Sequence, residues 1–216
     1  MQEQKSSFDS LQEIKDIRRI MERSSRFISL SGLSGVAAGA TALIGAGVAH
    51  HLLKNYKENH SFENFSYDAS DWLSIRLTGL AILIFAFALS VAFFFTWRRA
   101  KKQGLPVWDH TSRRLAWKIL IPLVTGAAFI FGMLRYDAWV FVSPACLIFY
   151  GLALVNASKY TLADIRYLGY CEILLGLINM YFIGYGLWFW AIGFGVLHIV
   201  YGIIMWNKYE RKPRVL

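Results

Sequence analysis

Residues 187–206 have the sequence LWFWAIGFGVLHIVYGIIMW, and this stretch decides the fold class. It is close to the roughly 20 residues that an α-helix needs to cross the hydrocarbon layer of a membrane. It contains no Asp, Glu, Lys or Arg, and its single histidine is His198. The stretch therefore predicts a transmembrane helix.

Five other apolar blocks of similar length precede it, at residues 27–53, 72–97, 115–135, 139–156 and 167–184. Hydrophobic residues make up 56% of the 216 residues and charged residues 17%, whereas a soluble domain carries about 25% charged residues. This composition excludes an ordinary soluble domain, and two cysteines are too few for a disulfide scaffold. We expect an all-α membrane protein with six transmembrane helices in one bundle.

The basic residues predict how the spans are oriented. If the N-terminus is cytoplasmic, all but four of the 23 Lys and Arg residues lie on the cytoplasmic face, and the exceptions are Lys54, Lys57, Arg76 and Arg135. Cytoplasmic loops of membrane proteins carry such an excess. We therefore expect a multi-pass membrane protein with both termini in the cytoplasm. The net charge of +9 complements anionic lipid at that face, and nucleic acid is not an expected partner because no recognition motif accompanies the basic clusters.

Two charged segments flank the spans. Residues 1–26 predict a cytoplasmic amphipathic helix, because Leu11, Ile14 and Met21 fall on one side of a helix. This helix either lies in the lipid interface or under the bundle, or it binds a cytoplasmic protein. Residues 207–216 are expected to form a basic cytoplasmic tail.

Small residues in the first span predict close helix packing. Gly35 and Gly39 are four residues apart, so they share one face of the helix, and small residues on such a face let another helix approach closely. The partner is either another helix of the same bundle or the same helix of a second copy in a homodimer.

Two ionisable side chains, Glu172 and His198, lie inside predicted spans. Each begins a similar stretch, EILLGLI at 172–178 and HIVYGII at 198–204. Because the two spans are antiparallel neighbours, a rise of about 1.5 Å per residue puts the two side chains at similar depth. A charge at the centre of a span costs about 2.5–3.5 kcal/mol on insertion scales, so such residues face the bundle interior and mark functional sites by default. The pair is either a hydrogen-bonded structural contact or a proton-binding or ligand-binding site.

Four more polar residues are expected near the cytoplasmic ends of the spans, namely Ser31, Ser34, Asn156 and Lys118. Together with Glu172 and His198 they predict a polar cavity open to the cytoplasm, in which all six are candidates for binding a ligand or a proton. The alternative is that Lys118 extends to the interface and that the serines bond to carbonyls of their own helix. Asn179, nearer the middle of its span, is expected to form an interhelical hydrogen bond.

No motif of a known enzyme class occurs, and histidines of different spans lie at different depths, so they cannot assemble a haem or zinc site. We therefore predict no catalytic residues, no metal site and no cofactor. The function that follows is that of a non-enzymatic membrane protein with a regulatory or partner-binding role, to which the resemblance described below adds a stress-related one. The alternative is a small proton-coupled transporter or channel with a cytoplasmic-side polar cavity around Glu172 and His198.

A resemblance to a known family rests on glycine spacing in the last two spans. The segment 168–205 carries short aliphatic runs separated by Gly169, Gly176, Gly193, Gly195 and Gly202, with a Gly184-Tyr185-Gly186 turn between the spans. It resembles the hairpins of the acid-resistance membrane protein family, small bacterial proteins of six spans. The resemblance implies two three-helix halves and a stress-related role in the inner membrane. The chain departs from that pattern in two ways, because its first three spans do not copy the last three and its N-terminal segment is long and charged.

Overall fold

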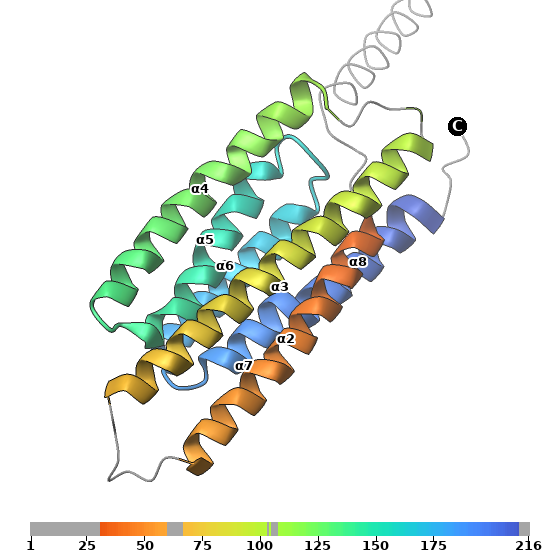
Figure 1. The fold of residues 1–216 in the computed structure, drawn as a ribbon. Helices are drawn as coiled ribbons and strands as arrows, with labels where there is room; N and C mark the ends of the chain where they lie inside the picture. The colour runs from red at the N-terminus through yellow and green to blue at the C-terminus, as the bar shows by residue number, and fades with distance from the viewer. Residues whose placement is uncertain (1–30, 60–66, 103, 105–107, 212–216) are drawn as a thin grey trace, which may run out of the picture.

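The computed structural model describes residues 31–59, 67–102, 104 and 108–211. All regular elements in this part of the chain are helices, which confirms the all-α prediction. In chain order they are α2 (Gly32–Asn59), α3 (Tyr67–Lys102), α4 (His110–Arg135), η1 (Trp139–Phe141), α5 (Val142–Ala157), α6 (Ile165–Tyr181), α7 (Gly186–Trp190), η2 (Ala191–Leu197), α8 (His198–Trp206) and η3 (Asn207–Arg211). They run roughly parallel to one axis in an elongated bundle (Figure 1). The helix predicted over residues 1–26 lies outside the described residues.

Five of the described helical segments are long and apolar enough to cross a membrane, as in a multi-pass membrane protein. They are Gly32–Tyr56, Trp72–Lys102, His110–Arg135, Trp139–Ala157 and Gly186–Arg211. The sixth expected span corresponds to α6, which has 17 residues. Large apolar side chains cover the outside of the bundle, and on α3 the exposed fractions of Leu83 and Phe93 are 67% and 62%. Such a surface suits contact with lipid.

Helix ends differ from the limits of the apolar blocks because capping groups, and not hydrophobicity, determine where a helix begins. The helix α4 begins five residues before its apolar block, at a reciprocal cap between Asp109 and Ser112. The backbone N–H of Ser112 donates to Asp109 Oδ1 at 2.6 Å, and the backbone N–H of Asp109 donates to Ser112 Oγ at 2.7 Å. At the other end of the chain, residues 207–211 continue the last helix as η3.

The bundle has two distinct ends. At the first, which we call the basic end, α2 begins, α3 ends, α4 begins and η3 lies (Figure 1). At the second, the hairpin end, η1 joins α4 to α5 and residues 182–185 join α6 to α7. Gly184 has a φ of 102° in the second connection, a conformation that glycine adopts without a steric penalty.

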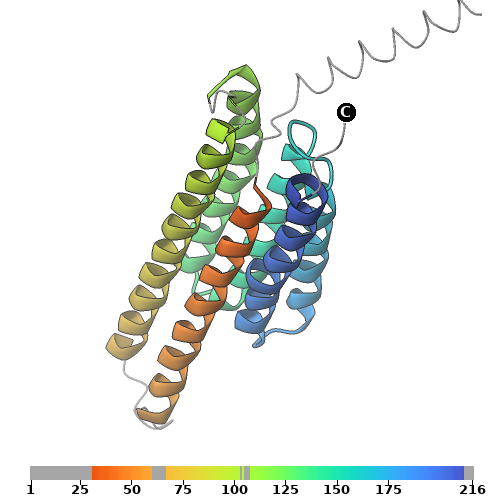
Figure 2. The same ribbon diagram turned by 90° about the vertical axis from the view of Figure 1, so that its right-hand side faces the viewer.

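The small-residue face of α2 packs against the last helical segment. A Cβ atom added at Gly35 would lie 3.2 Å from the Cα of Gly202, and one added at Gly39 would lie 2.6 Å from the carbonyl oxygen of Gly195. Gly35 and Gly39 therefore face another helix of the same chain. Figure 2 shows α2 between α3 and α8.

A second glycine spacing, of seven residues, occurs both in α6 and in the last helical segment. Gly169 and Gly176 are seven residues apart, as are Gly195 and Gly202. A Cβ atom added at Gly169 would lie 2.8 Å from the carbonyl oxygen of Gly151 in α5. The two helices that carry the similar stretches 172–178 and 198–204 are thus each packed closely on one neighbour. These close contacts fix the depth of Glu172 and His198 against those neighbours.

Candidate functional site

Glu172 lies on the buried face of α6, and its exposed fraction is 0%. Space for its carboxyl group is made by Gly193 in η2, since a Cβ atom added at Gly193 would lie 2.5 Å from both Glu172 Oε2 and Leu147 Cδ2. The carboxyl group is therefore enclosed by α6, η2 and α5. Any larger residue at position 193 would occupy the same space.

His198 begins α8 and lies beside this carboxyl group. Its Nδ1 is 3.5 Å from Glu172 Oε1 and 3.0 Å from the carbonyl oxygen of Gly193. The two ionisable side chains are therefore buried side by side, as the sequence predicts. Gly193 belongs to the π-helical segment η2, which directly precedes His198.

Tyr150 of α5 completes the group, and sequence patterns did not identify it. Its hydroxyl oxygen lies 2.7 Å from His198 Nε2, and its ring centroid is 5.3 Å from that of the imidazole. A neutral imidazole has one N–H donor. If Nδ1–H donates to Gly193, Nε2 is the acceptor for the Tyr150 hydroxyl. The only sequence signal was that a tyrosine inside a span needs a partner for its hydroxyl.

Glu172 has no hydrogen-bond partner in the described part of the chain, although His198 is near. Three buried side-chain atoms there lack a partner, namely Glu172 Oε1, Glu172 Oε2 and Asn179 Oδ1. Native proteins satisfy nearly all buried polar groups, so each exception requires an explanation. The hydrogen bond expected for a purely structural Glu172–His198 pair is not formed.

The other predicted site residues lie in separate places. Ser31 and Ser34 are at the basic end, where Ser31 Oγ lies 3.3 Å from Glu210 Oε1 and Ser34 Oγ donates to the Ser31 carbonyl at 2.5 Å. Asn156 links α5 to α4, because its Nδ2 donates to the backbone oxygen of Lys118 at 2.9 Å. These hydrogen bonds do not unite the four residues with Glu172 and His198 in one cavity. Ser34 thus bonds to a carbonyl in its own turn, as in the alternative that the sequence left open, whereas Ser31 contacts Glu210 of η3 instead.

Asn179 differs from its prediction as well. Its Nδ2 donates to the carbonyl oxygen of Phe182 at 3.3 Å, in the turn that follows its own helix. Its exposed fraction is 1%. The expected interhelical hydrogen bond is replaced by this local one, because Asn179 lies two residues from the end of α6 and not near the middle of a longer span.

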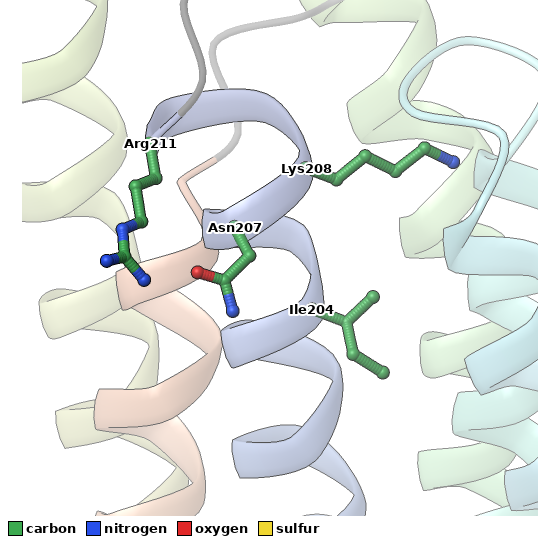
Figure 3. A pocket seen from close by; sticks show the side chains of 4 residues that line it. All are labelled: Ile204, Asn207, Lys208 and Arg211. Atoms are coloured by element: carbon green, nitrogen blue, oxygen red, sulfur yellow. The ribbon is translucent and has the colours of Figure 1, made fainter.

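A recess of about 790 Å³ lies at the basic end and is lined by Ile204, Asn207, Lys208 and Arg211 (Figure 3). In that view the side chains of Lys208 and Arg211 extend in opposite directions. Lys208 Nζ is engaged by Asp164 Oδ2 at 2.6 Å. The recess is thus a surface feature of the basic end, and it does not include the buried Glu172.

The chemistry available to the buried group is that of proton binding. In the described part of the chain, no cluster of three or more His, Cys, Asp or Glu residues could hold a metal ion.

Comparison with protein-family models, with curated proteins and with solved structures found no match. The resemblance of the last two spans to the acid-resistance membrane protein family stays a prediction. What the fold and site define is an all-α, multi-pass type of membrane protein with a buried carboxyl group beside an imidazole.

Proposed function

We propose that this chain is a protein of the bacterial inner membrane in which Glu172 takes up and releases a proton, as the proton-binding residue of a small transporter or channel. One observation carries the proposal, the fully buried carboxyl group without a hydrogen-bond partner, 3.5 Å from His198. The orientation with both termini in the cytoplasm is supported by the basic residues that flank the spans at one end.

The free-energy cost of burying the Glu172 carboxyl group favours a functional role for it over a structural one. An unsatisfied buried polar group costs about 1–3 kcal/mol of folding free energy. Packing alone would be served better by an apolar side chain at position 172, so the carboxyl group must be useful for another reason. Carboxyl and imidazole groups can exchange protons in the physiological range when their environment allows it. When the carboxyl group ionises, His198 Nδ1 is the nearest donor that can stabilise the charge.

The test is proton flux into proteoliposomes that hold a pH-sensitive dye and are subjected to a pH gradient. The wild-type protein should admit protons faster than empty liposomes, and the substitution Glu172→Gln should abolish the excess because an amide does not exchange a proton near neutral pH. A matched control is Glu58→Gln, the same change at an exposed carboxylate that pairs with Lys54 at 3.7 Å. Equal flux in the Glu172→Gln and wild-type proteins would refute the proposal.

The second candidate is a non-enzymatic regulatory or stress-related protein that binds a cytoplasmic partner. The observation in its favour is the closure of the basic end, where Glu210 Oε1 accepts from the backbone of Gly32 at 2.6 Å and from Arg99 at 3.1 Å. These contacts hold α2, α3 and η3 together at the basic end, as expected for a bundle that does not open there. Under this candidate, liposomes with the wild-type protein would admit protons no faster than empty ones.

A further inference from the structure

We propose that Asn179, Ser143 and Gly186 form a water-binding station through which Glu172 exchanges protons with the hairpin end of the bundle. The inference rests on the proposed function of Glu172 and adds the route that its proton takes. The ligand of the station is water, which can both donate to an unpartnered oxygen and carry a proton.

The first support is the position of the unpartnered atoms. In the described residues, every buried side-chain oxygen without a partner belongs to Glu172 or Asn179. These two residues are seven positions apart on α6, so they share one face of the helix and are separated by about 10 Å along its axis. Both belong to the stripe of α6 that packs into the bundle. The two unpartnered residues therefore lie along one buried path parallel to the axis of α6.

The second support is the group of oxygen atoms around Asn179. Ser143 Oγ of α5 donates to the carbonyl oxygen of Gly186 at 2.7 Å. A Cβ atom added at Gly186 would lie 3.1 Å from Ser143 Cβ, 3.6 Å from Ser143 Oγ and 3.9 Å from Asn179 Oδ1, so the absence of a side chain at position 186 leaves both polar groups beside the glycine. The proton of Ser143 is already donated, and Asn179 Oδ1 therefore needs another donor. A buried water with two to four polar neighbours is the usual solution.

The third support is the contrast between the two ends of the bundle. Between Glu172 and the basic end lies an apolar cluster of Leu162, Ile165 and Met205, against which Tyr201 packs. On the other side, Asn179 is two residues from the end of α6, and Phe182 in the following turn has an exposed fraction of 55%. The polar route from Glu172 therefore leads to the hairpin end, which the sequence predicts to be the outer one.

Proton transfer along this route breaks one O–H bond for each O–H bond that it forms. An O–H bond of a hydronium ion or water at the station breaks as an O–H bond to the next water forms, and the last step forms the O–H bond of the Glu172 carboxyl group. The reverse sequence returns the proton. The titratable groups beside Glu172 are His198 of α8, whose Nδ1 is 3.5 Å from Glu172 Oε1, and Tyr150 of α5, whose hydroxyl contacts the other side of the imidazole.

The experiment measures hydrogen–deuterium exchange of the Glu172 carboxyl group by infrared spectroscopy of the full chain in lipid. The carboxylic C=O band of Glu172 is assigned by its loss in Glu172→Gln. After transfer to D2O, Asn179→Leu should slow the band shift about tenfold or more, the factor that a lost hydrogen bond to a polar group produces, and Ser143→Ala should slow it less. Ser143→Ala also decides the case if Asn179→Leu fails to fold.

Two controls separate the route from general effects. Asn156→Leu makes the same change where the amide bonds to Lys118 of α4, and Tyr201→Phe alters the side of Glu172 facing the basic end. Both should exchange at the wild-type rate. Wild-type rates in Asn179→Leu and Ser143→Ala, or slowing by Tyr201→Phe instead, would overturn the station and leave the function of Glu172 standing. A wild-type protein without any exchangeable Glu172 band would instead refute the proposed function.

Discussion

Glu210 caps the first described helix, because its Oε1 accepts a hydrogen bond from the backbone N–H of Gly32 at 2.6 Å. The same oxygen lies 3.1 Å from Nη1 of Arg99, near the end of α3. A carboxylate at a helix N-terminus satisfies a free backbone donor and interacts favourably with the helix dipole. One side chain of η3 thus holds α2 and α3 together at the basic end.

Replacing Glu210 with Ala should lower the free energy of unfolding by about 1–3 kcal/mol, because the change removes a charged acceptor from a partly buried pair. Thermal unfolding in detergent measures the effect. The control is Glu58→Ala, which removes an exposed i,i+4 pair with Lys54 worth about 0.5 kcal/mol or less. Equal stability of the two variants would show that the cap contributes nothing beyond a surface ion pair.

Gly39→Leu should destabilise the bundle by about 1–3 kcal/mol or prevent its assembly, because the new side chain would meet the backbone of Gly195. A matched control lies on the same helix. Around Gly47 an added Cβ atom would meet nothing within 4 Å, so Gly47→Leu should leave thermal unfolding almost unchanged. Equal thermal unfolding of Gly39→Leu and Gly47→Leu would contradict the close packing of α2 on the last helical segment.

The helix-facing positions of Gly35 and Gly39 and the Glu172–His198 pair could be predicted from the sequence because a membrane restricts how helices can pack. Helices must satisfy their own backbones, small residues mark close contacts, and ionisable groups turn away from lipid. Tyr150 and Glu210 were not predicted. A tyrosine in a span has no distinctive spacing, and the role of Glu210 depends on contacts with residues more than 100 positions away. Hydrophobicity likewise could not show that residues 207–211 continue a helix.

Asp164, in the connection between α5 and α6, links stability to pH. Partial burial acts to raise the pKa of its carboxyl group, but hydrogen bonds from Lys208 and Tyr209 outweigh it and hold the pKa below its ordinary value of 3.8. A carboxyl group with a lowered pKa in the folded state contributes stability that is present above its unfolded pKa and is lost as the pH falls through its folded pKa.

Wild-type protein should therefore be more stable than Asp164→Asn at pH 7 by about 0.5–1 kcal/mol, a modest value because the Lys208 side chain is 47% exposed. The difference should shrink as the pH falls from about 5 to below 3. Thermal unfolding of both proteins across this range measures it. A difference that stays constant with pH would mean that the charge of Asp164 does not contribute.

The orientation can be tested by labelling single cysteines with a membrane-impermeant reagent, after replacement of Cys146 and Cys171. A cysteine at position 104, between α3 and α4, should react only once the cytoplasmic side is accessible. A cysteine at position 58, near the end of α2, should react in intact cells. The opposite pattern would reverse the assignment of both termini to the cytoplasm and make the hairpin end the inner one.

Tyr150 is expected to be a positioning residue for His198. Tyr150→Phe keeps the ring packed against the imidazole and removes the hydroxyl at 2.7 Å from Nε2, so it should cost about 0.5–1.5 kcal/mol of stability, the usual net value of one hydrogen bond. A purely structural role would end there. If Tyr150 also fixes the tautomer that His198 presents to Glu172, the pH profile of proton flux should shift in Tyr150→Phe while the rate at the optimum changes less. An unshifted profile together with the loss of stability would limit Tyr150 to packing.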